Sequence, residues 1–226
     1  WYNSTATTFQ FQYAAITDAW STGGNLNTAR RLLGGAGTQT AALAFGGGAN
    51  PDSTAITESW NGTNWTETAD LNTGRRGLAG AGTKTAALAF GGNPGFKAST
   101  EEFNTGVVGG SWATGGSLNT ARETLGGTGV STAALAFGGG PGSKNETELY
   151  NGTNWTEVNN LTTARGYLTG CGTNTAALAF GGNVTPNSVQ SLTETWNGTN
   201  WAAVNTLNVA RRSLGAAGTN TAALAF

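Results

Sequence analysis

The polar residues best suited to chemistry are five arginines that recur along the chain at similar intervals: Arg30, Arg75, Arg122, Arg165 and Arg211. Each stands ten positions after a tryptophan of a second repeated series: Trp20, Trp65, Trp112, Trp155 and Trp201. A guanidinium group can hold a carboxylate or a phosphate through two parallel hydrogen bonds. The five arginines could therefore form an anion-binding rim, or each could pair with an acid and with loop carbonyls of its own scaffold.

Four glutamates are suitable partners for these arginines, because each stands two positions before a repeated aromatic residue: Glu58, Glu101, Glu148 and Glu194. In the N-terminal copy, Phe9 or Phe11 takes this place, so one arginine would lack a carboxylate. Two such acids could in principle cleave a glycosidic bond. A catalytic pair is normally asymmetric, however, whereas these acids recur copy after copy. A structural role is therefore favoured for both series.

Other catalytic chemistry finds little support in the residue types. The chain has no histidine, which excludes Ser-His-Asp and Cys-His pairs and any histidine-ligated metal. Its single cysteine, Cys171, aligns with small residues of the other copies and has no activating base, which indicates a buried residue and not a nucleophile. We therefore expect neither an enzyme nor a cofactor or metal site.

The composition limits the partners. The net charge is −1 and only 10% of the residues are charged, which argues against binding to nucleic acid or to an anionic membrane. The longest apolar core, AALAF, has five residues, far fewer than the roughly 20 that span a bilayer. The chain starts at Trp1 without Met and stops inside a repeat, so we expect a fragment, a processed product or part of a longer protein.

The elements that must position these residues are repeated as well. AALAF occurs five times, at 41–45, 86–90, 133–137, 176–180 and 222–226. This short apolar run suits a buried strand. Three more strands are predicted in each unit: the Arg-x-x-Leu run before AALAF, the aromatic segment after Gly-Gly, and the segment that begins at the tryptophan. Asn-Gly turns connect the last two in most copies. Four short antiparallel strands in about 45 residues are typical of a propeller blade.

The unit resembles a kelch repeat: an apolar run, Gly-Gly, a variable loop, an aromatic residue, then Trp, with Arg opening the next copy. The units also resemble repeat proteins encoded by marine phages and environmental sequences. The resemblance implies an all-β, five-bladed propeller of four-stranded blades and a single domain over 1–226, with residues 1–8 as a tail or linker. The repeat marks span 20–45, 65–90, 112–137, 155–180 and 201–226. The tryptophans could stack sugars, but in kelch repeats they usually pack between blades.

The two ends of the chain are expected to share one blade. Residues 211–226 supply a first and a second strand without successors, whereas Phe9–Tyr13 and Trp20 precede any such pair. We expect the N-terminal strands to complete the C-terminal blade and to close the ring, which removes open sheet edges. The alternative is an exchange of these strands between two chains.

Most variation between copies falls in the loops 46–56, 91–99, 138–146 and 181–192, which we expect on the same rim as the arginine connections. Variable loops on a rigid scaffold commonly carry recognition, although drift at unconstrained sites would give the same pattern. The candidate ligand-binding residues are the five arginines together with the following loop residues: Asn50, Asp52, Asn93, Lys97, Lys144, Asn145, Asn187 and Gln190.

These observations favour a non-enzymatic adhesion or surface-display module that recognises a glycan or a surface protein. A virion or extracellular location follows from the resemblance and from the polar, weakly charged composition. The alternative is a purely structural virion protein, such as a capsid or tail decoration, that acts through protein–protein contacts and could form a homo-oligomer. A carboxylate-based glycosidase is the third hypothesis.

Overall fold

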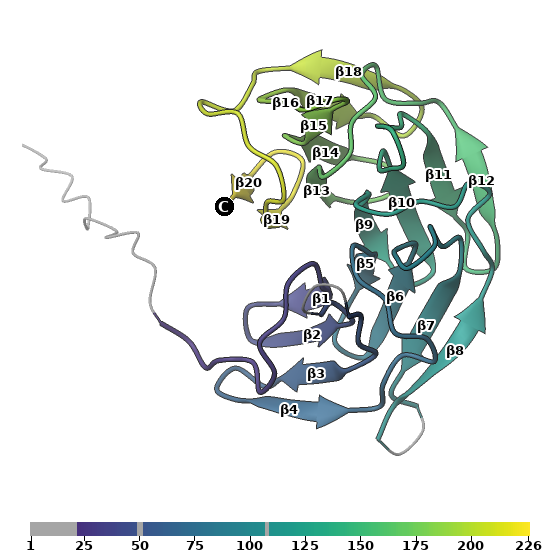
Figure 1. Ribbon diagram of the computed structural model, residues 1–226, viewed down its shortest axis with the longest axis vertical. Coiled ribbons are helices and arrows are strands. Elements are labelled where there is room, and N and C mark those ends of the chain that lie inside the picture. Colours follow the sequence, from purple (N-terminus) through teal and green to yellow (C-terminus); the bar gives the residue numbers. More distant parts are fainter. Residues whose placement is uncertain (1–21, 49–51, 107–108) are drawn as a thin grey trace, which may run out of the picture.

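The computed structural model describes residues 22–48, 52–106 and 109–226, and its strands are arranged as blades around a central axis (Figure 1). Four antiparallel sheets of four strands form the complete blades of this β-propeller ring. Within the described residues there is no helix that is long and apolar enough to cross a membrane.

The strands of each blade follow one another from the axis outward. Blade 1 contains β1 (Gly34–Thr38), β2 (Ala41–Phe45), β3 (Thr57–Trp60) and β4 (Trp65–Thr68). Blade 2 contains β5 (Ala79–Gly82), β6 (Ala86–Phe90), β7 (Thr100–Asn104) and β8 (Ser111–Gly115). Blade 3 contains β9 (Gly126–Val130), β10 (Ala133–Phe137), β11 (Thr147–Tyr150) and β12 (Trp155–Val158). Blade 4 contains β13 (Thr169–Gly172), β14 (Ala177–Phe180), β17 (Thr193–Trp196) and β18 (Trp201–Val204).

Within the described residues, four blades are complete and the fifth unit is present in part. It consists of β19 (Ala216–Gly218) and β20 (Ala223–Ala225), which pair with each other beside the opening of the ring (Figure 1). The strands expected to complete it, at Phe9–Tyr13 and Trp20, lie outside the described residues. The loop 181–192 adds a small hairpin that was not expected, β15 (Asn183–Val184) with β16 (Ser188–Val189).

The repeated AALAF segment forms the second strand of every unit, as its short apolar run predicts. In blade 3 it pairs with the glycine-rich first strand on one side and with the aromatic third strand on the other. Both faces of the blade are covered by neighbouring blades, so Leu135, Ala136 and Phe137 have no exposed surface. This double coverage explains why the second strand contains no polar residue.

Adjacent blades are held together by side chains that recur at one position in each copy. Leu125 packs on Gly91 of the preceding blade, where an added Cβ would lie 2.8 Å from the leucine. Leu78 and Leu168 occupy the same place in their blades, and all three are at most 6% exposed. The ring of Phe90 fills the space beside Gly127 of the next blade, so a side chain at Gly127 has no room.

The two faces of the ring carry different connections. Residues 31, 76, 123 and 166, next to the repeated arginines, bridge to the loops that follow Gly-Gly. We call this side the loop face. The opposite side, the turn face, carries the Asn-Gly turns and the Thr-rich hairpins; for example, the indole of Trp60 donates to the Gln39 carbonyl of the adjacent hairpin. The structure thus confirms that the loops and the arginine connections share one rim.

The leucine contact between blades predicts a large loss on truncation. We expect Leu125→Ala to lower the free energy of unfolding by about 2–5 kcal/mol, because it leaves a cavity between two blades. Val130→Ala is the control, since Val130 is 49% exposed on the turn face and should change stability by no more than about 0.5 kcal/mol. Urea denaturation measures both changes, and equal losses would contradict the packing described above.

Candidate functional site

Four of the repeated arginines form buried ion pairs with the repeated glutamates. The Nη2–Oε1 distances are 2.8 Å for Arg30–Glu58, 3.0 Å for Arg75–Glu101, 2.7 Å for Arg122–Glu148 and 2.9 Å for Arg165–Glu194. None of these side chains is more than 4% exposed. Burial lowers the pKa of Arg75, Arg122 and Arg165, and the charge of the paired glutamate opposes this shift.

Each of these arginines also clamps the base of a variable loop, as blade 3 illustrates. Nη1 of Arg122 donates to the carbonyl of Gly138, where the loop begins, at 3.0 Å, and to the carbonyl of Glu146, where the loop ends, at 2.7 Å. The second oxygen of Glu148 accepts from the backbone N–H of Asn119 at 2.6 Å. One ion pair therefore joins the third strand, both ends of a loop and the connection between blades.

These four guanidinium groups are consequently occupied by the scaffold and lie below the surface of the loop face. Arg211 differs, because it belongs to the partial fifth unit. Its side chain is exposed, and its Nη1 donates to the Ala225 carbonyl at 3.4 Å. The arrangement corresponds to the structural alternative for four arginines and leaves Arg211 as the exposed member of the series.

The candidate residues of the first two loops have different surroundings. Asp52 is exposed on the loop face, while Asn50 lies outside the described residues. Asn93 is half-buried: its side-chain amide donates to Glu123 at 2.7 Å, and its backbone pairs with residue 76. Lys97 is half-buried, and its backbone N–H donates to the Gly92 carbonyl.

The candidate residues of the other two loops are largely engaged with their neighbours. Lys144 forms a half-exposed ion pair with Glu146 at 3.3 Å, and the amide of Asn145 donates to the Leu161 carbonyl at 3.4 Å. Asn187 is exposed and accepts a hydrogen bond from Arg212 at 2.9 Å. Gln190 donates to the Ser188 carbonyl at 2.8 Å within the β15–β16 hairpin.

Neighbouring loops are bonded to one another, so the loop face is continuous. The Ser143 hydroxyl donates to the Asn183 carbonyl at 3.1 Å and lies 2.8 Å from the Thr185 hydroxyl of the next loop. Similarly, the Ser53 hydroxyl donates to the Asn93 carbonyl at 3.4 Å. These bonds hold the loops of adjacent blades in fixed positions relative to one another.

A belt of backbone hydrogen bonds surrounds the central opening on the loop face. Its members stand two positions after each repeated arginine: Leu32, Gly77, Thr124, Tyr167 and Ser213. Each N–H donates to the carbonyl of the member before it, at 2.8, 2.6, 2.8 and 2.9 Å along the series. In the part of the chain that the structure describes, neither the first N–H, of Leu32, nor the last carbonyl, of Ser213, has a partner.

All five belt residues have left-handed backbone conformations, although only one is glycine. Their φ angles lie between 51° and 62°. For a residue with a side chain this conformation costs about 1–2 kcal/mol, and such strain tends to cluster at functional sites. The five copies carry five different residues here, and Leu32 and Tyr167 are 36% and 40% exposed. The guanidinium of Arg212 lies 5.9 Å from the centre of the Tyr167 ring.

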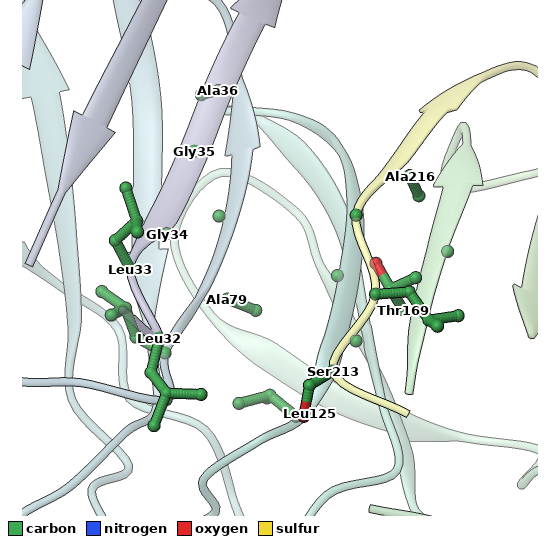
Figure 2. A pocket seen from close by; sticks show the side chains of 18 of the residues that line it. Leu32, Leu33, Gly34, Gly35, Ala36, Ala79, Leu125, Thr169, Ser213 and Ala216 are labelled. Carbon is green, nitrogen blue, oxygen red and sulfur yellow. The ribbon is translucent and has the colours of Figure 1, made fainter. Parts of the chain in front are cut away.

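The belt marks the entrance of a cavity of about 700 Å³ on the axis. Figure 2 shows Leu32 and Leu33 on one side of this cavity, with Ser213 and Ala216 facing them from the fifth unit. A second cavity, of about 210 Å³, continues between the glycine-rich first strands toward the turn face. Among the described residues, those lining the two cavities are uncharged, so the space suits a neutral occupant.

The site residues that could carry a reaction have other roles in the described part of the chain. Residues 22–48, 52–106 and 109–226 bring no three His, Cys, Asp or Glu side chains together in a way that could hold a metal ion. Cys171 is 4% exposed, its Sγ contacts the Thr219 carbonyl at 3.5 Å, and burial raises the pKa of its thiol. The repeated glutamates are held by arginines and backbone N–H groups.

The belt residues were missed by the sequence analysis, although a signal for them exists. They are the one position inside the Arg-x-x-Leu run that differs in every copy. Variation next to a repeated arginine and a repeated leucine marks a side chain that the scaffold does not require. The left-handed conformation itself cannot be read from leucine, threonine or tyrosine, because these residues usually avoid it.

The buried ion pair predicts strong coupling between its two residues. We expect Arg122→Met and Glu148→Gln each to lower the free energy of unfolding by about 3–5 kcal/mol, because each leaves an uncompensated buried group. The double variant should lose less stability than the sum of the two single losses. Additive losses of unfolding free energy in urea denaturation would contradict the pairing. Lys144→Met is the control, since its half-exposed ion pair should contribute only about 0–1 kcal/mol.

Comparison with known proteins adds no relative: no family model matches the chain, and no curated protein matches it. The propeller architecture therefore rests on the arrangement of the strands, and the likeness to kelch repeats rests on the repeated residues.

Proposed function

We propose that this chain is a non-enzymatic binding module that recognises a glycan at the centre of its loop face. The belt around the cavity entrance is the observation that supports this site. Five positions share one backbone conformation and one pattern of hydrogen bonds, yet each presents a different side chain. A strained position that keeps leucine, threonine and tyrosine where glycine would cost less indicates that these side chains serve another purpose.

The chemistry of the loop face suits a neutral, hydroxyl-rich ligand. Tyr167 at the entrance and Phe96 on the loop 91–99 are 40% and 41% exposed, and each offers an aromatic face for apolar contact with a sugar ring. The exposed side chain of Asn187 offers hydrogen bonds on the same face. Binding sites of this kind combine apolar surface with a few polar groups at fixed positions.

The scaffold that we propose for this site is a kelch-like propeller of five blades, closed by its own N-terminal strands. The belt supports this number, because all five copies of the repeat contribute residues to the wall of one cavity. For such a weakly charged chain we propose a virion or extracellular location, where it would act as an adhesion or surface-display module.

A structural role in a virion is the second candidate. The hydrogen bonds between loops of adjacent blades favour it, since they create a rigid surface that suits contact with another protein. In that case a capsid or tail protein, or a second copy of this chain, would occupy the loop face, and no sugar would bind.

Replacing Tyr167 by glycine tests the glycan site without harming the scaffold. We expect Tyr167→Gly to unfold at the same or a higher temperature, because Gly77 adopts the same conformation at the equivalent place. Binding to a glycan array should fall at least about tenfold, which corresponds to roughly 1.4 kcal/mol of lost contact. Gln39→Ala, an exposed change on the turn face, should leave binding unchanged.

The loops are tested with a second variant on the same array and on host cells. Shortening 181–192 to the nine residues of 91–99 should weaken binding while the domain stays folded. Unchanged sugar binding in both variants would rule out this face. The absence of any sugar binding by the folded wild-type protein, combined with capture of a virion protein, would favour the structural role.

A further inference from the structure

Arg212 is an exposed arginine on the loop face whose contacts are with neutral groups. Its Nη1 donates to the Oδ1 of Asn187 at 2.9 Å, and its guanidinium lies 5.9 Å from the centre of the Tyr167 ring. The ion pairs of residues 22–48, 52–106 and 109–226 involve other cations: Arg30, Arg75, Arg122, Arg165 and Lys144. Within these residues, Arg212 is therefore held in place without an acid that balances its charge.

The backbone on both sides of Arg212 is tied to blade 4. On one side, the N–H of Arg211 donates to the Gln190 carbonyl at 3.1 Å. On the other side, the N–H of Ser213 donates to the Tyr167 carbonyl at 2.9 Å, as part of the belt. Because both bonds reach residues of blade 4, that blade sets the position of Arg212 beside the cavity entrance.

The β15–β16 hairpin supplies the side chain that orients this guanidinium. Asn187 lies in the turn between the two short strands of the hairpin, and the turn is fixed to blade 3, since the N–H of Thr185 donates to the Ser143 hydroxyl at 2.9 Å. An arginine held by a fixed acceptor and by an aromatic ring loses less conformational entropy on binding than a free surface arginine. The hairpin and the belt thus preorganise Arg212.

The position of Arg212 carries different charges around the ring. The residues that directly follow the five repeated arginines are Arg31, Arg76, Glu123, Gly166 and Arg212. In blade 3, Glu123 accepts from the Asn93 amide at 2.7 Å, so a neighbouring loop engages this acid. Arg31 is exposed and precedes Leu32, which lies across the cavity from Ser213 in Figure 2. The cations of this series thus belong to the fifth unit and to blades 1 and 2.

We propose that the glycan bound at the loop face is acidic and that Arg212 binds the carboxylate of a uronic acid. This inference deepens the glycan-binding function proposed above and rests on it. With Nη1 turned to Asn187, the N–H groups of Nε and Nη2 form a fork that can donate two parallel hydrogen bonds to one carboxylate. Because the described lining of the cavity is uncharged, the sugar ring occupies the entrance and its carboxylate stays outside, beside Arg212.

A preference for an acidic sugar would be a local property of this rim. The net charge of the chain is −1, so the protein as a whole has no general attraction for polyanions. A hydrogen bond between two charged groups is roughly twice as strong as one between neutral groups, which favours a carboxylate over a hydroxyl beside Arg212. The neutral ring contacts proposed for the entrance remain the same for both kinds of sugar.

Matched sugars test the charge of the ligand. An array should carry uronic-acid oligosaccharides beside their methyl esters, in which the same rings lack the negative charge. We expect the wild-type protein to bind an acidic form about tenfold or more tightly than its ester. This preference should shrink as the salt concentration rises. Equal binding of acid and ester would overturn the carboxylate site, and so would binding to sulfated sugars without binding to uronic acids.

Three variants locate the site. Arg212→Gln should remove the preference, so that the acid binds only as tightly as its ester. Asn187→Asp keeps the size of the side chain but gives Arg212 an internal carboxylate, which should compete with that of the ligand and reduce the preference as well. Lys84→Gln removes the same charge from the turn face and should change nothing. A preference that survives Arg212→Gln, or that falls equally in Lys84→Gln, would overturn the assignment to Arg212.

The outcomes separate this inference from the glycan function itself. Arg212 and Asn187 are exposed, so their variants should melt at the temperature of the wild-type protein, and thermal unfolding checks that each is folded. Binding to esters with no preference for acids would keep the glycan site and overturn the inference alone. The absence of any sugar binding by the folded wild-type protein would overturn both.

Discussion

The guanidinium of a repeated arginine, held without exposed surface against a glutamate, is the interaction on which each complete blade depends. A buried charge of this kind is tolerated only when its partner and its remaining hydrogen bonds are in place. Arg122 meets most of this condition through Nη1 and Nη2, which reach Glu148 and both ends of a loop, while its buried Nε has no hydrogen-bond partner among the described residues. The third strand, the loop base and the connection between blades must therefore keep one geometry in every copy.

This constraint separates the scaffold from the surface that we assign to recognition. Because the arginine fixes only the carbonyls at the base of each loop, residues between these anchors are free to vary in number and in type. The loop 181–192 uses this freedom to form an additional hairpin, β15–β16. The belt shows the same separation at the centre of the ring, since its bonds join backbone groups and do not depend on which side chain stands at each position.

Much of the architecture could be read from the repeated residues. AALAF predicted the second strands, the Asn-Gly turns predicted the outer hairpins, and the glutamates were correctly named as the partners of four arginines. The described residues show four complete blades and two strands of a fifth, and the segments expected to complete it, at Phe9–Tyr13 and Trp20, lie outside them. The belt was missed because Leu32 and Tyr167 occupy a conformation that their residue types usually avoid.

The backbone belt has a consequence for how such a protein can diversify. Tandem repeats of such similar sequence favour unequal recombination, which moves whole units from one place in the gene to another. Every unit brings the same peptide groups to the belt, so a shuffled ring would still form its hydrogen bonds. The order of the side chains around the entrance would change at each such event. A single genetic step could thus produce a new combination of leucine, glycine, threonine, tyrosine and serine on an unaltered frame.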